Sequence, residues 1–319
     1  MILGFADFSY LPVAKIWYNQ LTSLGYKNHF IVALDPAAYQ NLTESDNFHR
    51  TLGSTEFAFS HNRRFSGIQG KGGFDKIMGF RQQFLKSLVD LGYNVLATDV
   101  DTIWMKYVDV EQQLTGKMGE KIGKIGKIGK TKNTEKPAES FITDIYNAKS
   151  GTNWPKTVFD RFGFTVSGFF LAYRSTENTK QFLKKMLERC ENKKCDDQAE
   201  INNVYFDMGM EFENGEDFDP KNPANRITGH ALKTTPRSHV LEELNVVVLG
   251  DEMVTRNGAM NSLDRNFCGE DRDGKNWIIS PSRNSGNFIE SHHVDAKMEV
   301  FREYLECFEE EVRSEVEAY

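Results

Sequence analysis

Two apolar runs that flank one helical stripe constrain the fold more than any other feature of the sequence. The runs cover residues 2–8 and 29–34, and between them apolar side chains recur at helical spacing over residues 11–24. Gly25 marks the end of this helix. A strand, a helix and a second strand in this order predict a βαβ unit, in which the two strands run parallel.

The same alternation continues along the chain. Residues 77–88 show helical spacing, and the apolar run 94–98 follows them. Further strands and helices are predicted at 167–173, 177–189, 244–249 and 294–312. This order predicts an α/β fold with a Rossmann-like mixed, mostly parallel sheet and helices on both faces. Because no linker divides two cores, residues 1–319 are expected to form a single domain.

Charge and hydropathy exclude two classes of partner. The 319 residues include 46 acidic and 39 basic side chains and carry a net charge of −7, so the chain lacks the overall positive charge of a nucleic-acid-binding protein. No apolar run approaches the roughly 18 residues that span a bilayer, and Asp7 interrupts the first run before a signal peptide forms. We therefore expect no nucleic-acid partner and no membrane segment in this chain.

Residues 116–136 interrupt the α/β pattern. Lys-Ile-Gly repeats three times there, and seven of the 21 residues are lysine. Such a low-complexity segment buries too little apolar surface to order itself. It is expected to be a disordered, solvated insert within the domain.

The sequence Asp99-Val100-Asp101 directly follows the predicted strand 94–98. Side chains at positions i and i+2 of a strand share a face, so both carboxylates are expected to project together at the carboxyl edge of the sheet, where open α/β sheets bind ligands. Adjacent carboxylates repel unless a cation lies between them, and oxygen ligands suit Mn²⁺ or Mg²⁺. The pair predicts a metal site that also holds a diphosphate; a pair of solvated loop acids is the alternative.

Two enzyme classes fit this motif. Haloacid-dehalogenase-like, Mg²⁺-dependent phosphatases carry Asp-x-Asp-x-Thr/Val after a strand, which residues 99–103 nearly match, and residues 250–252 resemble their later acidic motif. Glycosyltransferases that use nucleotide sugars carry paired acids whose metal neutralises the departing nucleoside diphosphate. The phosphatase motif normally lies on the first strand, whereas two or three α/β elements precede Asp99 here. Position therefore favours the glycosyltransferase.

Four ordered blocks of the sequence resemble the nucleotide-diphospho-sugar transferase domain. Within it, they resemble glycosyltransferase family 77, the plant and algal arabinosyl-, xylosyl- and galactosyltransferases. The blocks are residues 4–35, 76–104, 167–186 and 196–202. The resemblance implies a GT-A fold, Mn²⁺ or Mg²⁺, a nucleotide-sugar donor that is usually UDP-linked, and retention at the anomeric carbon. It also implies a hydroxyl acceptor on a glycan or glycoprotein.

The resemblance assigns roles to individual residues. Asp99 and Asp101 match the metal-binding pair, and the third metal ligand is expected from His292 or His293, of which His293 lies nearer to Lys297. Catalytic contacts with the donor sugar are implied for Asp197 and Gln198. Further donor contacts are implied for Asp7, Asp35, Lys76, Ser167 and Gly168. Asp7 and Asp35 end predicted strands, where the fold holds the nucleoside, and each also fits a helix cap.

Two expectations concern the cellular compartment and the cysteines. Family members work in the Golgi lumen, in cell-wall or glycoprotein glycosylation, so this compartment is expected although the sequence shows no anchor. Cys190 and Cys195 have a spacing that permits a small disulfide loop and does not fit paired Cys-x-x-Cys zinc sites.

A degenerate, non-catalytic sugar-nucleotide-binding domain is the remaining alternative function, because the Asn that the family commonly carries before Gly168 is replaced in this sequence.

Overall fold

A computed structural model of the chain describes the fold. The described residues are 1–45, 51–52, 71–105, 107, 143–150, 152–191, 195–210, 230–233, 244–249, 254–257, 278–281, 293–303 and 310–318. The predicted insert at 116–136, the acidic residues 250–252 and His292 lie outside them, as do the side chains of Lys76 and His293. No helix among the described residues is long and apolar enough to cross a membrane.

The centre of the fold is an eight-stranded sheet with the order β3-β2-β1-β4-β7-β6-β9-β8. Its strands are β1 (Ile2–Ala6), β2 (His29–Ala33), β3 (Thr51–Leu52), β4 (Val95–Thr98), β6 (Ile145–Lys149), β7 (Val166–Tyr173), β8 (His230–Lys233) and β9 (Asn245–Leu249). The β3-β2-β1-β4 half is parallel, and β6 pairs with β9 in parallel. β7 runs antiparallel to both β4 and β6, as β8 does to β9. The predicted mixed sheet is confirmed.

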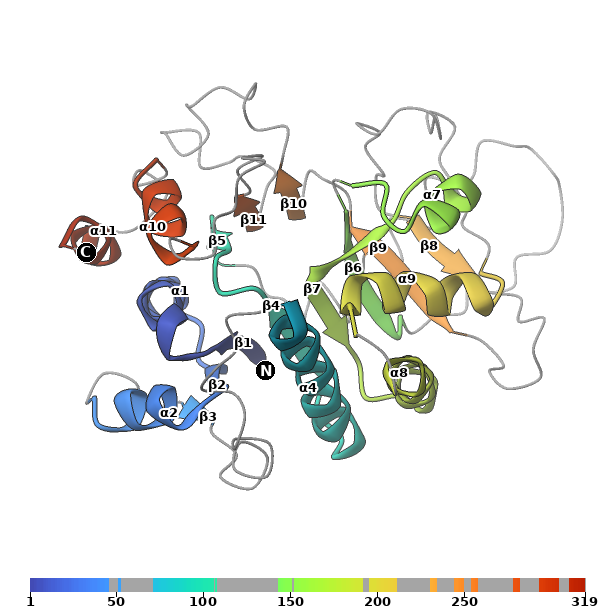
Figure 1. Cartoon of the computed structure of the whole chain (residues 1–319), viewed down its shortest axis with the longest axis horizontal. Helices are drawn as coiled ribbons and strands as arrows, with labels where there is room; N and C mark the ends of the chain where they lie inside the picture. The colour runs from blue at the N-terminus through green and yellow to red at the C-terminus, as the bar shows by residue number, and fades with distance from the viewer. Residues whose placement is uncertain are drawn as a thin grey trace, which may run out of the picture.

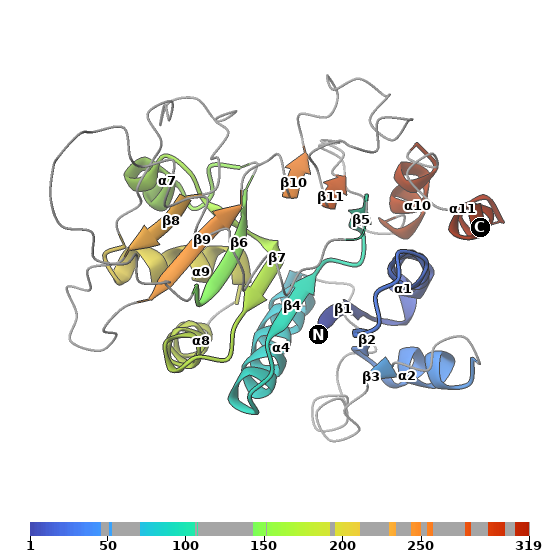
Figure 2. The same cartoon turned by 180° about the vertical axis from the view of Figure 1, so that it is seen from behind.

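Helices cover both faces of this sheet. They are η1 (Phe8–Tyr10), α1 (Leu11–Ser23), α2 (Pro36–Thr43), α4 (Lys71–Asp90), α7 (Lys156–Phe162), α8 (Glu177–Cys190), α9 (Asp197–Asp207), α10 (His293–Glu303) and α11 (Glu310–Ala318). Figure 1 shows α4 and α9 in front of the strands, and in the reverse view of Figure 2 the strands lie in front of these two helices. The single helix predicted at 294–312 corresponds to α10 and the start of α11.

Alternate residues of the strands feed two separate cores. In β9, Val246 and Val248 belong to the buried cluster that includes side chains of α4, α7, α8 and α9, whereas Val247 and Leu249 belong to the cluster that includes side chains of α1, α2, α10 and α11. Because side chains alternate along a strand, a strand that is apolar at every position must be buried on both faces. This is why β7, with eight buried residues, occupies the middle of the sheet.

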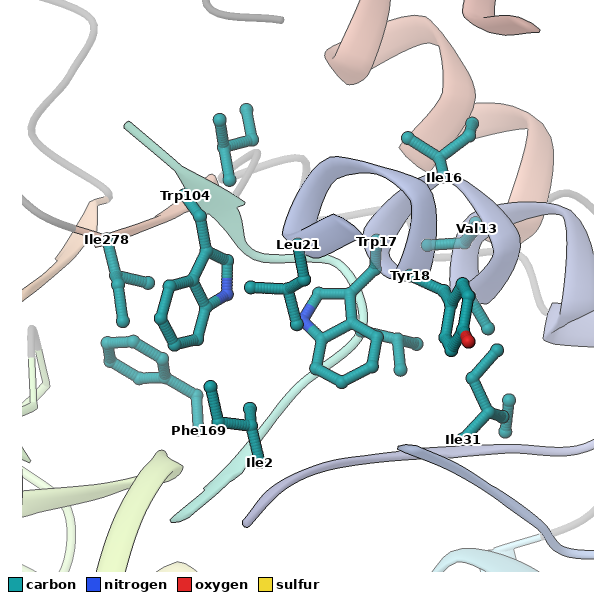
Figure 3. Packing of buried hydrophobic residues seen from close by; sticks show 14 of the residues in the cluster. Ile2, Val13, Ile16, Trp17, Tyr18, Leu21, Ile31, Trp104, Phe169 and Ile278 are labelled. Carbon is teal, nitrogen blue, oxygen red and sulfur yellow. The ribbon is translucent and has the colours of Figure 1, made fainter. Parts of the chain in front are cut away.

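A second, three-stranded sheet has the order β10-β11-β5, formed by Val254–Asn257, Ile278–Pro281 and Ile103–Trp104. Figure 3 shows Trp104 of β5 between Ile278 and the α1 side chains Leu21 and Trp17. The buried Gln20 side chain donates to the Trp104 carbonyl and accepts from its N–H, both at 3.1 Å. These contacts fix the chain immediately after the Asp99-Val100-Asp101 motif.

Candidate active site

The Asp99-Val100-Asp101 motif lies in a turn that begins where β4 ends. The Asp99 N–H donates to the Phe169 carbonyl at 3.0 Å, which ties the turn to β7. The N–H and the hydroxyl of Thr102 both donate to the Asp99 carbonyl, at 3.3 and 2.7 Å. The two carboxylates leave from a turn and not from a strand, so the expectation that they share one strand face is wrong.

A glycine in β1 lets the motif approach the sheet closely. A Cβ built on Gly4 lies 2.5 Å from Cγ1 of the buried Val100 and 3.0 Å from the Trp17 ring. Real Cβ atoms do not come this close, so any side chain at Gly4 displaces Val100 or Trp17. Gly4 thereby helps to position the two acids on either side of Val100.

Arg81 of α4 is a buried cation behind the motif. Its Nη1 donates to Asp99 Oδ1 at 2.8 Å, and its Nη2 donates to the Gly168 carbonyl at 2.6 Å. Nη2 also forms an ion pair with Asp197. Burial lowers the pKa of Arg81, but the charges of Asp197 and Asp99 raise it further, so the net pKa shift is upward and the guanidinium stays charged. One side chain therefore connects α4, the turn that carries Asp99, β7 and α9.

Asp197 lies in the first turn of α9 and is 4% exposed. Its Oδ2 accepts a second hydrogen bond, at 3.1 Å, from the Gln82 amide of α4. A Cβ built on Gly168 lies 2.9 Å from Asp197 Oδ1 and 3.2 Å from Arg81 Nη2. Gly168 therefore has no side chain at the point where the carboxylate and the guanidinium meet.

Gln198 lies beside Asp197 and joins α9 to the ends of two strands. Its Oε1 accepts a hydrogen bond from the Ser167 hydroxyl at 3.4 Å, and its Nε2 donates to the hydroxyls of Ser150 and Thr152 at 3.2 and 3.4 Å. Ser150 follows β6, and Ser167 lies near the start of β7. Because β6 and β7 are antiparallel, these positions lie at the same sheet edge as Asp99.

Asp7 and Asp35 follow β1 and β2 at this edge and cap the next helices. Asp7 accepts from the Tyr10 N–H at 3.0 Å, and Asp35 accepts from the N–H groups of Ala38 and Phe8 at 2.8 and 2.7 Å. Burial and then the charges of Asp101, Asp99 and Asp7 raise the pKa of Tyr10. The Tyr10 side chain is therefore close enough to Asp7 and to both acids of the motif to be affected by their charges.

The family model described as nucleotide-diphospho-sugar transferase matches residues 25–236, which include Lys76, Asp99, Asp101, Gly168 and Asp197. The chain belongs to this family. It is accordingly a glycosyltransferase, and the phosphatase interpretation of the acidic motif is set aside. A sequence comparison with curated proteins gives no match.

Several solved glycosyltransferase structures are similar to this transferase. The WbbM bifunctional glycosyltransferase aligns at 12% identity with a TM-score of 0.47, over 93% of this chain and 48% of that one, so this chain spans about half of its length. Galactosyltransferase LgtC in complex with donor and acceptor sugar analogues aligns at 10% identity with a TM-score of 0.44, over 98% and 99%. Mouse xyloside xylosyltransferase 1 aligns at 9% identity with a TM-score of 0.41, over 90% and 98%.

The acids of the transferase fit a divalent metal. Asp101 is 9% exposed, and its Oδ2 is paired with Lys297 of α10, whereas its Oδ1 is buried and has no hydrogen-bond partner among the described residues. A buried, unpartnered carboxylate oxygen is costly unless a cation binds it. Within the described part of the chain, no group of three or more His, Cys, Asp or Glu is arranged so that it could hold a metal ion. A cation at these two acids would need further ligands from outside the described residues or from the donor.

Two predicted residues of the transferase are placed by their backbone alone. Lys76 lies in the first half of α4, five positions before Arg81. His293 is the first residue of α10, one helical turn before Lys297. Since Lys297 contacts Asp101, the start of α10 lies on the same side of the molecule as the motif.

The sequence prediction missed Arg81, although a signal was present. The predicted helix 77–88 has apolar side chains at positions 77, 80, 84 and 88, and Arg81 occupies the same stripe four residues after Ile77. A charged side chain on the buried stripe of a helix requires charged or polar partners. The sequence did not show that these partners are Asp99 and Asp197.

Proposed function

We propose that this protein is a metal-dependent glycosyltransferase that moves a sugar from a UDP-linked donor to a hydroxyl group of a glycan or glycoprotein, with retention at the anomeric carbon. The observation that supports the metal dependence is the buried Oδ1 of Asp101, which has no hydrogen-bond partner among the residues that the structure describes and lies two positions from a second acid, Asp99. Family 77 membership and work in the Golgi lumen are part of the proposal, supported by the four sequence blocks.

In this proposal Asp99 and Asp101 hold Mn²⁺ or Mg²⁺, with His293 as a third ligand. When bound there, a divalent cation would supply positive charge to stabilise the leaving nucleoside diphosphate. Lys297, which is paired with Asp101, and Lys76 add positive charge near the same oxygens. Such preorganised charge is usually the largest contribution to catalysis of this kind.

The donor sugar is proposed to lie against Asp197, Gln198, Ser167 and Gly168. These four positions are joined in two pairs, because Arg81 contacts both Gly168 and Asp197, and Gln198 contacts Ser167. Side chains fixed in this way lose little conformational entropy when a ligand binds. Asp7 and Asp35, at the ends of β1 and β2, are proposed to border the nucleoside.

The test is turnover of UDP- and GDP-linked sugars in the presence of Mn²⁺, measured as released nucleoside diphosphate. The wild type is expected to release UDP, and Asp101→Asn is expected to reduce turnover about 10²-fold or more. Asp160→Asn is the matched control, because this carboxylate is 54% exposed in an ion pair with Lys156 and lies outside the site. The anomeric configuration of the product, determined by NMR, tests retention.

Other outcomes distinguish the alternatives. Binding of UDP and Mn²⁺ without turnover of any sugar nucleotide indicates the degenerate binding domain. Turnover at the wild-type rate in EDTA contradicts metal dependence. Release of phosphate from a generic ester, with no use of nucleotide sugars, overturns the proposal.

A further inference from the structure

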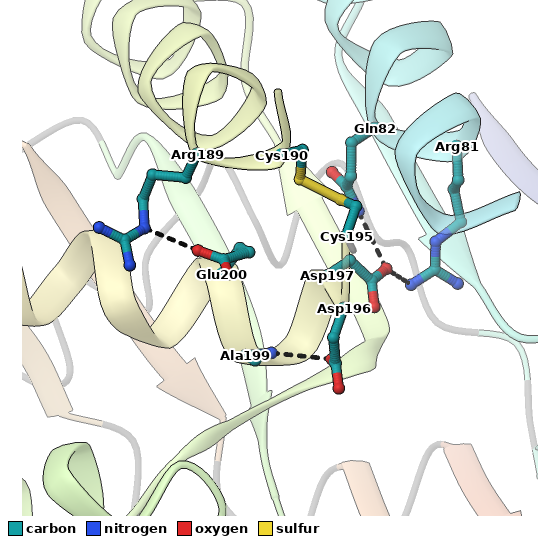
Figure 4. The surroundings of a disulfide bond; sticks show 9 residues. All are labelled: Arg81, Gln82, Arg189, Cys190, Cys195, Asp196, Asp197, Ala199 and Glu200. Carbon is teal, nitrogen blue, oxygen red and sulfur yellow. Dashed lines mark hydrogen bonds and ion pairs between the residues drawn. A yellow bond between two sulfur atoms is a disulfide. The ribbon is translucent and has the colours of Figure 1, made fainter. Parts of the chain in front are cut away.

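A disulfide joins the end of α8 to the segment that leads into α9. Cys190 is the last residue of α8, and Cys195 lies two residues before Asp197, the first residue of α9. Figure 4 shows this disulfide next to Asp197, Gln82 and Arg81. The covalent bond is therefore separated from a proposed donor-site carboxylate by a single residue, Asp196.

The intervening residue transmits the position of Cys195 into the helix. Asp196 is the N-cap of α9, and its side chain accepts a hydrogen bond from the Ala199 N–H at 3.0 Å. The first turn of a helix has no internal partner for this N–H, so the cap fixes where α9 begins. Moving Cys195 thus moves the start of the helix and, with it, Asp197.

α4 provides the surface against which this segment packs. A Cβ built on Gly79 lies 3.7 Å from Cys195 Cβ and 3.9 Å from Cys195 Sγ, so the disulfide is almost in contact with the α4 backbone. Arg81 and Gln82, two and three residues further along α4, bind Asp197. The disulfide and the Asp197 carboxylate therefore contact the same short stretch of α4.

A second connection between α8 and α9 lies on the other side of the disulfide. Arg189, the neighbour of Cys190, donates to Glu200 at 2.6 Å and also pairs with Asp207. Glu200 is 6% exposed, and Arg189 lies in the last turn of α8. These ion pairs hold Glu200 in the first turn of α9 and Asp207 at its end, whereas the disulfide is the link nearest in sequence to Asp197.

We infer that the Cys190–Cys195 disulfide is a positioning element of the donor site, which holds Asp197 against Arg81 and Gln82. The inference rests on the proposed function, in which Asp197 contacts the donor sugar. Reduction by a dithiol transfers two electrons and two protons to the two sulfurs. The S–S bond breaks, two thiols form, and the dithiol closes its own disulfide. The first turn of α9 is then tied to α8 by non-covalent contacts alone.

The test compares the oxidised wild type, the dithiothreitol-reduced wild type and a Cys190→Ala/Cys195→Ala variant. Reduction and substitution are both expected to accelerate amide hydrogen exchange at residues 197–203 and to lower kcat/KM for the donor about tenfold. Mn²⁺-dependent affinity for UDP is expected to stay unchanged, because Asp99 and Asp101 lie on the turn after β4 and Asp99 keeps its own hydrogen bond from Arg81 when α9 shifts. A simple loss of fold does not produce this split between UDP affinity and donor turnover.

Dithiothreitol added to the double variant is the matched control, and no further change is expected because no Cys190–Cys195 bond is left to reduce. Unchanged exchange at residues 197–203 in the reduced wild type overturns the inference. Because hydrogen exchange is measured on the reduced wild type, it tests the inference even if the double variant does not fold. Faster exchange in a protein that turns over no sugar nucleotide leaves the positioning role standing and contradicts the proposed function instead.

Discussion

Arg81 and Asp197 form a buried ion pair between residues 116 positions apart in the chain. Each side chain is 5% exposed, so water cannot solvate either charge if its partner is removed. Removing one member of such a pair leaves an uncompensated buried charge. Breaking the pair is therefore expected to destabilise the fold and to disturb the geometry of the proposed donor site.

Substitution of Arg81 by Met is expected to lower the free energy of unfolding by about 3–5 kcal/mol, because Asp197 is left buried without a cation. Urea denaturation measures the change. Adding Asp197→Asn to this variant is expected to restore part of the loss. Lys156→Met, at an exposed ion pair, is the control and is expected to change stability by less than about 1 kcal/mol. A loss in Arg81→Met as small as that of the control contradicts the prediction.

Asp101→Asn is expected to abolish Mn²⁺-dependent binding of UDP, because the amide removes a negative ligand. If Asp101 only repelled Asp99, removing its charge would leave the stability of the metal-free protein unchanged or raise it. In the structure, however, Asp101 forms an ion pair with Lys297. Since these side chains are only 12% and 13% exposed, losing the pair is expected to destabilise the metal-free protein by about 1–3 kcal/mol. Calorimetry with UDP and thermal melting in EDTA measure the two effects. Equal UDP binding by the wild type with and without EDTA contradicts the metal role.

His293→Ala is expected to weaken Mn²⁺ affinity about 10- to 100-fold, the scale seen when the coordination of a metal site is disturbed. Its place at the start of α10, one turn before Lys297, supports this choice. Titration of Mn²⁺ by calorimetry measures the effect, with His292→Ala as the matched comparison. A defect in His292→Ala alone assigns the ligand to that residue, and no defect in either removes histidine from the metal site.

Stability is expected to fall steeply above pH 10. Burial raises the pKa of both Tyr173 and Tyr205, which are each 1% exposed. Tyrosine in the unfolded chain ionises near pH 10. Because the folded pKa is the higher one, the stabilising contribution is complete below pH 10 and is lost as the pH rises above it, by about 1.4 kcal/mol per pH unit for each tyrosine.

Urea denaturation at a series of pH values measures this slope. Tyr205→Phe is expected to reduce it, although the variant also loses the 2.6 Å hydrogen bond from the Tyr205 hydroxyl to Asn147. Tyr93→Phe, at a tyrosine that is 50% exposed, is the control and is expected to leave the slope unchanged. A slope that does not differ between Tyr205→Phe and the wild type contradicts the assignment.

The order of helices and strands was predictable because it follows from local periodicity. The apolar stripe at 11–24 corresponds to α1 (Leu11–Ser23), and the stripe at 77–88 lies within α4 (Lys71–Asp90). The two acids were correctly placed after β4, since residues that directly follow a strand in the sequence must lie at the edge of the sheet where that strand ends. The prediction that they share one strand face was wrong. The Asp99 N–H still pairs with Phe169 of β7, but the hydrogen bonds from Thr102 to the Asp99 carbonyl turn the chain there.

The sequence by itself determined which segments form strands and helices, that acidic residues lie at a sheet edge, and the likeness to nucleotide-sugar transferases. Only the tertiary structure decided which charges meet. Arg81 reaches Asp99 and Asp197 because α4, the β4 turn and α9 converge at one edge of the sheet, and Lys297 reaches Asp101 across most of the chain. Periodicity reports contacts within a few residues, whereas these pairs depend on how buried helices pack on the two faces of a sheet.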